Sequence, residues 1–512
     1  MRTIPITETE LSQYFELPNL RLRSYFGRVR TGQPEVYRTS FYRGTPLQQV
    51  LQNWLDRLEP IKDQWPSLWN FENDLAKKVG PMSVMKPLKE RMADIASYYD
   101  SILLSQSPID PMAVAAVRDE WSRCHGLRLR TQFGTLEEMK KSTSSGNPFF
   151  TKKRMVCGRT VPFSLRSHGA DIIMDQPGHS WKATAILGWR GQEGGPKRSD
   201  VKQRVVWMFP FAVNVAELQF YQVIIKQAQA LNLVPAWIGL DAVSRNITRM
   251  FDTKSSKDLV VCTDFSAFDQ HFNPVMQEGA YQLWNSVLAD NEDNEWWLST
   301  VFPIKYNIPL LISEDTIIKG PHGMGSGSGG TNADETASHR MLQHEAAIRA
   351  GSKLNLYSQC LGDDGCLTYP GITVEHVVEQ YTSHGLEMNP SKQYDSTVDC
   401  IYLRRWYHKD YRENGICQGV YSTCRALGRL AEQERFYDPE VWGPKAVVMR
   451  ALSILENVKY HPLKEQFVEY CIKGDKFRLG LDIPGFFERD TLISEAKKLI
   501  NQMPDFLGYT RT

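Results

Sequence analysis

Two adjacent carboxylates stand between two glycines in the stretch S-Q-C-L-G-D-D-G-C, residues 358–366. The residues on either side are apolar and strand-like, so Asp363 and Asp364 are predicted to lie in the turn of a β-hairpin. Like charges side by side destabilise a fold unless a positive charge lies beside them. The turn is therefore predicted to bind a metal ion, and an ordinary surface turn is the alternative.

A second acidic site follows the apolar run L-V-V-C-T, residues 259–263, which reads as a buried strand ending at Asp264. Asp269 lies five residues further on, in the loop beyond the strand. If this strand lies beside the hairpin, three carboxylates converge, and two Mg²⁺ ions about 4 Å apart would neutralise them. Such a pair of ions catalyses in-line phosphoryl displacement. Zinc is disfavoured because no His or Cys stands at ligand spacing nearby.

Between the two acidic sites lies a loop rich in glycine and serine, G-M-G-S-G-S-G-G-T-N, residues 323–332. It opens onto a helical pattern, so its backbone N–H groups and the positive helix end suit an anion or the edge of a sugar. A flexible linker is the alternative. The functional interpretation is favoured because linkers seldom run directly into an N-capped helix.

Two basic features follow the hairpin. A helix over residues 373–384, ended by Gly385, leads into a loop that presents Lys392 near the acidic cluster, although most loop lysines are simply solvated. The next apolar run, residues 401–407, is predicted as one strand with Arg404 and Arg405 between aromatic residues. Asn414-Gly415 is a hairpin turn signal.

Positive charge is concentrated between residues 121 and 210. This segment holds sixteen Lys or Arg and six Asp or Glu, a balance of +10, whereas the whole chain carries only +1. Such an excess attracts phosphates through the release of counterions. A solvated basic face is the alternative interpretation.

Composition excludes several classes of protein. The 512 residues are enough for two to four structural units, and the apolar and charged fractions are those of a globular protein. Nine cysteines, an odd number without a C-x-x-C pair, suit reduced thiols better than a disulfide framework. The first residues lack the pattern of a secretory signal, and no apolar run approaches the ~20 residues of a membrane span. We therefore expect a protein without a membrane association.

In their order along the chain, these motifs resemble those of viral RNA-dependent RNA polymerases, from about residue 143 to about residue 407. The stretch T-S-S-G-N-P resembles the template-entry loop, with Ser144, Gly146 and Pro148. The stretch K-Q-R-V-V-W resembles the basic strand over the incoming triphosphate, with Lys202 and Arg204 and with Arg198 as an addition. The sequence around H-G-M-G-S-G-S-G-G-T-N-A-D-E-T is most similar to that of polymerases from double-stranded RNA viruses of the picobirnavirus and partitivirus kind.

The acidic motifs resemble the catalytic centre of the same family. D-x4-D resembles the first palm motif, G-D-D the metal-binding hairpin, and S-G-x3-T the sugar-sensing loop, with Ser326, Gly327, Thr331 and the neighbouring Asn332. The loop at Lys392 resembles the one that bears a proton-donating lysine. The strand with Arg404 and Arg405 resembles the one that grips the 3′ end of the growing strand.

The resemblance implies an α+β fold shaped as a right hand, with an antiparallel-sheet palm and largely helical fingers and thumb. We expect an N-terminal arm at 1–60, fingers at 61–256 with a further part at about 275–320, a palm at 257–425, and a thumb with a C-terminal tail at 426–512. Residues 60–256 read as helices mixed with Gly, Ser and Pro-rich loops, and residues after about 425 read mostly as helices.

The resemblance also implies template-directed RNA synthesis for a viral genome. Asp264, Asp363 and Asp364 would bind two Mg²⁺ ions, with Mn²⁺ as a substitute, while Lys392 acts as general acid. The implied partners are RNA template and product, ribonucleoside triphosphates and a viral capsid protein. The implied location is inside the virion and in the host cytoplasm.

One position departs from the family pattern. Many relatives have an Asn four residues after the Thr of the sugar-sensing motif, whereas this chain has Glu335. Asn332 is the preferred partner of Asp269, because a second carboxylate would repel Asp269 unless one of the two were protonated.

Two other functions compete with this prediction. A reverse transcriptase-like polymerase is disfavoured because such enzymes usually have a bulky aromatic residue where this chain has Asp269. A non-catalytic RNA-binding or capsid-scaffold protein explains the basic segment but not three carboxylates at strand ends.

Overall fold

The structure, a computed structural model, describes residues 1–500 and has a four-stranded antiparallel sheet at its centre. The strand order is β11-β12-β8-β13, and the strands are β8 (Val260–Thr263), β11 (Gln359–Leu361), β12 (Asp364–Leu367) and β13 (Tyr394–Ser396). The predicted buried strand and the predicted hairpin are both confirmed. β8 ends where β12 begins, so the two acidic sites lie at the same end of the sheet.

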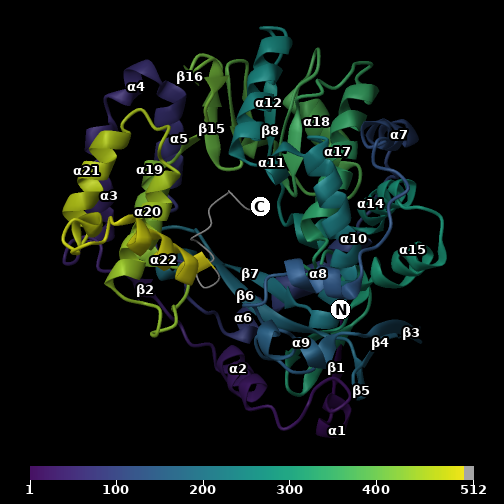
Figure 1. The fold of residues 1–512 in the computed structure, drawn as a ribbon. Coiled ribbons are helices and arrows are strands. Elements are labelled where there is room, and N and C mark those ends of the chain that lie inside the picture. Colours follow the sequence, from purple (N-terminus) through teal and green to yellow (C-terminus); the bar gives the residue numbers. More distant parts are fainter. Residues whose placement is uncertain (501–512) are drawn as a thin grey trace.

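Helices cover both faces of this sheet. They are needed on both because successive side chains of β8 point to opposite faces and all four are buried. Val261 belongs to the largest hydrophobic core, together with α17 (Thr331–Arg349), α14 (Pro274–Val287) and α7 (Pro111–Glu120). Val260 and Cys262 point to the other face, where they pack with α12 (Leu240–Thr253). α18 (Val374–Thr382) packs against α17, and both lie beside the sheet in Figure 1.

The basic segment contains the strand expected at Lys202, which is β7, and four further strands that the sequence analysis did not anticipate. β6 (Ala185–Gln192) and β7 (Lys202–Met208) are part of a five-stranded sheet in the order β1-β10-β9-β6-β7. Its other strands are β1 (Arg2–Pro5), β9 (Leu310–Ser313) and β10 (Thr316–Lys319). A separate sheet consists of β3 (Ser164–His168), β4 (Asp171–Gln176) and β5 (His179–Lys182). The start of the chain is therefore paired in a sheet rather than irregular.

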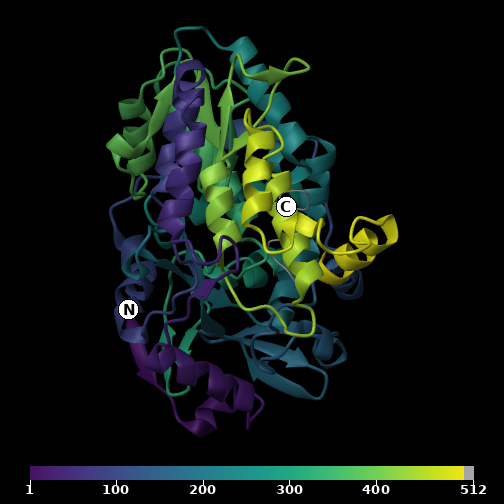
Figure 2. The same ribbon diagram turned by 90° about the vertical axis from the view of Figure 1, so that its left-hand side faces the viewer.

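Helices from the two ends of the chain share one hydrophobic core. α3 (Leu47–Leu58) and α5 (Pro66–Ala76) pack with α19 (Thr423–Ala431). The rings of Trp54 and Tyr470 lie 5.4 Å apart, and the Tyr470 hydroxyl donates a hydrogen bond to the Val50 carbonyl at 2.6 Å. Figures 1 and 2 both show the purple N-terminal helices beside the yellow C-terminal ones. The C-terminal helices are α20 (Pro444–Glu456), α21 (Lys464–Gly474) and α22 (Arg489–Ile500).

The helical prediction for the C-terminal part is confirmed over the described residues. The stretch K-A-V-V-M-R-A-L-S-I-L-E falls within α20, and L-I-S-E-A-K-K-L-I falls within α22. Residues 501–512, the end of the expected C-terminal tail, lie outside the described residues.

The prediction of one strand over residues 401–407 is wrong. The segment is a hairpin of β14 (Asp399–Tyr402) and β15 (Arg405–His408), in which Tyr402 pairs with Arg405. Leu403 and Arg404 form the turn with φ values of 50° and 58°. A turn with two positive φ values matches the twist of the flanking strands but usually contains Gly or Asn, and this one contains neither. The turn predicted at Asn414-Gly415 does connect β16 (Arg412–Glu413) to β17 (Ile416–Cys417).

The remaining elements connect these units. The longest is α10 (Phe211–Ala230), which lies between the five-stranded sheet and α17 in Figure 1. None of the helices within residues 1–500 is long and apolar enough to span a membrane. The other elements include β2 (Tyr37–Arg38), β18 (Val420–Tyr421), β19 (Glu432–Gln433), α1 (Glu8–Leu11), α2 (Leu20–Thr31), α4 (Ile61–Gln64), α6 (Leu88–Asp100), α8 (Gln132–Glu138), α9 (Cys157–Thr160), α11 (Pro235–Ile238), α13 (Phe268–His271), α15 (Glu292–Trp296) and α16 (Ile304–Asn307).

Candidate active site

The three predicted metal ligands come together at one end of the central sheet. Gly365 pairs with Thr263 in the β12–β8 ladder, so one further step along the antiparallel register sets Asp364 opposite Asp264. Asp363 occupies the tip of the β11–β12 hairpin, where Leu361 pairs with Asp364. Asp264 and Asp363 are exposed to solvent, and Asp364 is half-buried.

The hairpin turn is held by α17. Gly362 has a φ of +59°, a conformation that favours glycine, and its N–H donates to the Thr336 hydroxyl at 2.9 Å. His339 is buried, and burial lowers its pKa to about 4, so the neutral ring donates from Nδ1 to the Gly362 carbonyl at 2.8 Å. A Cβ at Gly365 would come within 2.7 Å of the His339 ring. The turn is therefore rigidly placed relative to the helix.

The acidic cluster carries uncompensated negative charge. Burial, and then the charge of Asp363, raises the pKa of Asp364 to about 7. Although the Asp363 side chain reaches solvent, the protein atoms around it displace much of its water, and this desolvation together with the charge of Asp269 raises its pKa. No ion pair of these carboxylates exists within residues 1–500, so a bound cation would relieve their mutual repulsion. This set of oxygen donors suits Mg²⁺.

The carboxylates do not form a complete metal cage on their own. Within the described part of the chain, no group of three or more His, Cys, Asp or Glu side chains is arranged to hold a metal ion. Magnesium usually retains waters and takes only one or two carboxylates together with substrate phosphates. The arrangement therefore suits a metal that arrives with a nucleotide better than a permanent structural ion.

Glu335 lies within electrostatic range of Asp269. Asp269 lies in the first turn of α13, and Glu335 is a buried residue of α17. Burial, and then the charge and proximity of Asp269, raises the pKa of Glu335 well above its usual range, which favours its protonated form. Asn332 instead accepts a hydrogen bond at Oδ1 from the Trp237 indole at 2.8 Å. The preference for Asn332 as the partner of Asp269 stays a prediction, and Glu335 is a second candidate because its protonated form does not repel Asp269.

The glycine-rich loop lies against β7, the strand with the predicted triphosphate-binding residues. The Ser326 hydroxyl donates to the Val205 carbonyl at 3.3 Å, and a Cβ at Gly327 would come within 1.5 Å of the Trp207 carbonyl. The Thr331 hydroxyl donates to the Gly325 carbonyl at 3.3 Å. This close approach of backbones explains why the loop needs glycine.

Two residues of α10 hold the same loop in place by hydrogen bonds. Glu217 is fully buried and accepts hydrogen bonds from the Ser328 hydroxyl and from the Gly329 N–H, the latter at 3.2 Å. Asn214 donates from Nδ2 to the Gly327 carbonyl at 3.2 Å. Burial raises the pKa of Glu217 to about 7. The sequence analysis missed both residues because no local pattern connects α10 to the loop.

The predicted triphosphate-binding residues lie at the start of β7 and just before it. Lys202 and Arg204 are exposed on β7, and Arg198 is exposed in the one-turn helix that precedes it. The positive charge of Arg204 opposes the rise in pKa of both Glu335 and Asp363. Arg204 therefore lies within electrostatic range of the acidic cluster.

Lys392 is exposed beside Asp264. It ends the one-turn helix Pro390–Lys392, and the next residue, Gln393, makes two hydrogen bonds to the backbone of Asp264. The loop that bears the lysine is thus attached directly to Asp264, the residue that follows β8. Sequence analysis found Lys392 but not Gln393, because the bonds depend on the pairing of β13 with β8.

The predicted template loop is mostly buried. Gly146 and Pro148 are buried, and Ser144 is half-buried. A Cβ at Gly146 would come within 2.3 Å of the Phe209 carbonyl, and Asn147 donates to the Lys182 carbonyl at 2.7 Å. Of the three residues, Ser144 is the one accessible to RNA in this conformation.

Arg404 and Arg405 have different environments, although they are adjacent. Arg404 is exposed in the β14–β15 turn and forms an ion pair with Glu193 at 3.2 Å. Arg405 is only 2% exposed, stacks over Tyr421 and donates to the Asn457 carbonyl at 3.1 Å. In this conformation Arg405 supports the fold, and Arg404 is the one positioned to meet RNA.

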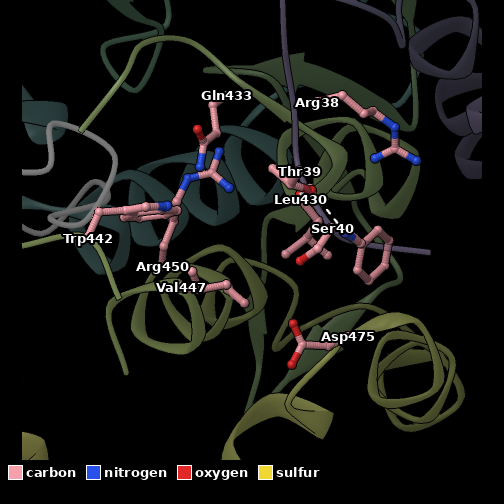
Figure 3. A pocket seen from close by; sticks show the side chains of 11 residues that line it. Arg38, Thr39, Ser40, Leu430, Gln433, Trp442, Val447, Arg450 and Asp475 are labelled. Carbon is pink, nitrogen blue, oxygen red and sulfur yellow. Dashed lines mark hydrogen bonds between the residues drawn. The ribbon is translucent and has the colours of Figure 1, made fainter. Parts of the chain in front are cut away.

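A cavity of about 270 Å³ lies elsewhere, between residues 38–41 and the C-terminal helices (Figure 3). Two of its charged lining groups bond to the protein: Arg450 donates to the Arg429 carbonyl at 2.6 Å, and Asp475 accepts from the Phe477 N–H at 2.9 Å. None of the predicted site residues lines it. The cavity is therefore separate from the candidate active site.

A right-handed arrangement around an antiparallel sheet, with carboxylates at neighbouring strand ends and a basic strand facing them, defines a nucleic-acid polymerase. A family model described as viral RNA-dependent RNA polymerase matches residues 117–420. The chain belongs to this family. The palm, fingers and thumb fold predicted from the sequence is confirmed.

Similar proteins point to the same activity. The chain is 60% identical over 501 residues to a potential RNA-dependent RNA polymerase of human picobirnavirus, covering 98% of this chain and 93% of that protein. It is 24% identical over 266 residues to the RNA-directed RNA polymerase of Cryptosporidium parvum virus 1, covering 50% and 49% of the two chains. A crystal structure of a human picobirnavirus RNA-dependent RNA polymerase matches with 58% identity and a TM-score of 0.95 over 99% of this chain and 96% of the other. Its insertion-loop deletion mutant matches with 58% identity and a TM-score of 0.94 over 98% of both chains.

The protein is therefore an RNA-dependent RNA polymerase, a nucleotidyltransferase that acts on RNA and ribonucleoside triphosphates. Enzymes of this family generally depend on divalent metal ions. Neither the reverse transcriptase-like alternative nor the non-catalytic scaffold is favoured.

Proposed function

We propose that Asp264, Asp363 and Asp364 bind two Mg²⁺ ions, with Mn²⁺ as a substitute. The observation that carries this proposal is the cluster at the sheet edge, where Asp264 and Asp364 lie opposite each other and Asp363 stands at the adjacent tip. The raised pKa values of Asp363 and Asp364 support a site built for cations. When bound, such ions increase the acidity of the attacking 3′-hydroxyl and neutralise charge on the triphosphate.

The protein's own groups would bind the nucleotide around this cluster. Arg198, Lys202 and Arg204 neutralise the triphosphate, which is supported by their exposure and by the influence of Arg204 on Asp363. The ribose lies by Asp269, and the glycine-rich loop supplies Ser326, Gly327, Thr331 and Asn332. A protonated Glu335 completes this contact by holding Asp269 in place.

Lys392 would act as the general acid that protonates the departing pyrophosphate oxygen. Its exposure and its attachment beside Asp264 support this role. The ammonium group also reduces the negative charge that develops on the leaving group.

RNA would contact two further regions. The template passes Ser144, Gly146 and Pro148, where Ser144 has the accessible side chain. Arg404 binds the 3′ end of the product, while the buried Arg405 stabilises the turn through its bond to Asn457. The basic excess of residues 121–210 lines the template and nucleotide channels.

We keep the domain boundaries as a proposal: an arm at 1–60, fingers at 61–256 and about 275–320, a palm at 257–425 and a thumb with a tail at 426–512. The pairing of β9 with β6 supports the inclusion of 275–320 in the fingers. The core that Leu68 and Phe71 share with Phe467 favours assigning residues 61–79 to the thumb instead. Residues 501–512 lie outside the described part.

The enzyme would act in transcription and replication of a double-stranded RNA genome, next to capsid protein inside the virion and in the host cytoplasm. The similarity to the picobirnavirus enzyme supports this setting.

The decisive experiment combines synthesis with direct metal binding. Purified protein, a single-stranded RNA template and four ribonucleotides are incubated with Mg²⁺ or Mn²⁺, with and without a primer. In parallel, Mn²⁺ binding in the presence of a nucleotide is measured by electron paramagnetic resonance for the wild type and for Asp363→Ala. Metal-dependent synthesis and weaker Mn²⁺ binding by the variant are expected, and unchanged Mn²⁺ binding would contradict the assigned ligands.

A further inference from the structure

Gln393 is a buried amide that joins the loop of Lys392 to the backbone of Asp264. Its side chain is 8% exposed. Oε1 accepts a hydrogen bond from the Asp264 N–H at 2.7 Å, and Nε2 donates one to the Asp264 carbonyl at 2.8 Å. The amide therefore satisfies both backbone groups of Asp264, the residue that follows β8.

These two bonds fill a gap in an antiparallel pairing. Cys262 pairs with Tyr394 in the β8–β13 ladder, and Ser266 pairs with Glu387 further along the same two segments. Between these points the second segment leaves the ladder and forms the turn that contains Lys392. The Gln393 side chain replaces the missing backbone partner of Asp264, so the departure of the turn does not leave Asp264 unsupported.

The same amide also closes the turn itself. Nε2 donates a second hydrogen bond, to the Asn389 carbonyl at 2.9 Å, and the Lys392 N–H bonds to that carbonyl at 3.0 Å. Asn389 caps the turn through its side chain, which accepts from the Ser391 N–H at 3.0 Å. The turn and the end of β8 are thereby connected through one side chain.

We propose that Gln393 is a positioning residue that fixes Lys392 relative to Asp264. The proposal rests on the role of Lys392 as general acid given above. Asp264 and Lys392 would act on the same triphosphate, one at the metal site and one at the leaving oxygen, so their separation has to be constant. A shift of about 1 Å in the position of a catalytic group lowers a rate by as much as ~10²-fold.

The test is a double-mutant cycle of Gln393→Met with Lys392→Leu. Methionine keeps the length and burial of the side chain but makes none of the three bonds. In the wild-type background, Gln393→Met is expected to lower kcat by about 10- to 100-fold with KM for the nucleotide changed less than about threefold. In the Lys392→Leu background, the same change is expected to cost less than about threefold, because the group it positions is already absent.

Gln132→Met is the matched control. Gln132 makes the same pair of bonds to the backbone of one residue, accepting from the Phe163 N–H at 3.0 Å and donating to the Phe163 carbonyl at 2.7 Å. Loss of this pair is expected to leave kcat unchanged. Thermal unfolding of all variants identifies a loss of folding, and Gln393→Asn, which retains the amide on a shorter chain, gives a second variant if Gln393→Met is unstable.

The outcomes separate this inference from the proposed role of Lys392. If Lys392→Leu keeps a normal kcat, the general-acid role itself is wrong. If Lys392→Leu is slow but folded Gln393→Met is not, or if the two losses multiply fully, Gln393 does not act through Lys392 and the inference is overturned.

Discussion

The backbone N–H of Leu403 donates a hydrogen bond to Oδ2 of Asp364 at 2.9 Å. This bond connects the β11–β12 hairpin to the β14–β15 turn, which carries Arg404. One oxygen of Asp364 is thus committed to the protein backbone, whereas Asp363 stands exposed at the tip of its hairpin. The two neighbouring carboxylates therefore have different environments: Asp364 is bonded to the turn that carries Arg404, and Asp363 is open to solvent.

Asp363→Ala is predicted to lower polymerisation by at least ~10³-fold, because it removes a metal ligand at the reacting centre. Folding should be retained or slightly improved, since the change removes repulsion between carboxylates. Single-nucleotide incorporation and thermal unfolding measure the two effects. Near-normal elongation by this variant would refute the two-metal proposal.

Lys392→Leu is predicted to slow nucleotide addition by roughly 10² to 10⁴-fold with nucleotide affinity largely kept. Lys392→Arg is the matched variant, because arginine keeps the positive charge but does not release its proton. Pre-steady-state kinetics with both variants separates the two effects. Recovery of the full rate by arginine, or a change in KM alone, would identify Lys392 as a phosphate binder instead.

Asp269→Ala is predicted to narrow the preference for ribonucleotides over deoxyribonucleotides by about one to two orders of magnitude while metal binding is kept. A site built to bind a hydroxyl rejects an analogue without it, because its own polar groups then lack partners. If the proposed contact of Glu335 with Asp269 exists, Glu335→Ala should have a similar effect. Asn332→Ala should then have a smaller one, since Asn332 bonds to Trp237.

Competition between the two sugar types measures this preference for each of the three variants. Glu335→Gln is the informative control, because an amide can still donate to Asp269. Unchanged sugar selectivity in all three alanine variants would mean that discrimination lies elsewhere.

Glu217→Gln is predicted to remove part of the pH dependence of stability. The pKa of Glu217 is raised by burial from 4.5 to about 7, so between these values the folded chain binds this proton more tightly than the unfolded chain. The contribution of Glu217 to folding is therefore full below pH 4.5 and falls as the pH rises to 7. Glutamine does not titrate and still accepts from Gly329.

The measurement is denaturant unfolding of both proteins from pH 5 to pH 8. The stability difference between variant and wild type should grow in favour of the variant by roughly 2 to 3 kcal/mol over this range. A difference that stays constant with pH would show that Glu217 does not hold a proton in the folded enzyme.

Local patterns predicted the centre of the site well. The hairpin at Asp363 and the strand that ends at Asp264 were predictable because each has apolar, strand-forming residues next to a glycine turn or an acidic strand end. Their convergence was expected only through the order of the motifs. The register that sets Asp264 opposite Asp364 is a tertiary property.

Features that depend on distant contacts could not be read from the sequence. Leu403 and Arg404 adopt left-handed conformations without Gly or Asn, so the composition contained no turn signal and the segment looked like one strand. The burial of Arg405 follows from its contact with Asn457, which lies 52 residues away. Glu335 becomes a second candidate partner of Asp269 only because it is buried, which the sequence does not show.

The hydrophobic core that helices from the two ends of the chain share also determines when the enzyme can finish folding. Tyr470 contacts Val50 across 420 residues of sequence, and Phe467 contacts Trp54. During synthesis on the ribosome, α3 and α5 therefore emerge first with their apolar sides uncovered, and Tyr470 follows 420 residues after Val50. Completion of this core is in this way delayed until α21 has been translated, so a product without α21 would leave the apolar sides of α3 and α5 open to aggregation.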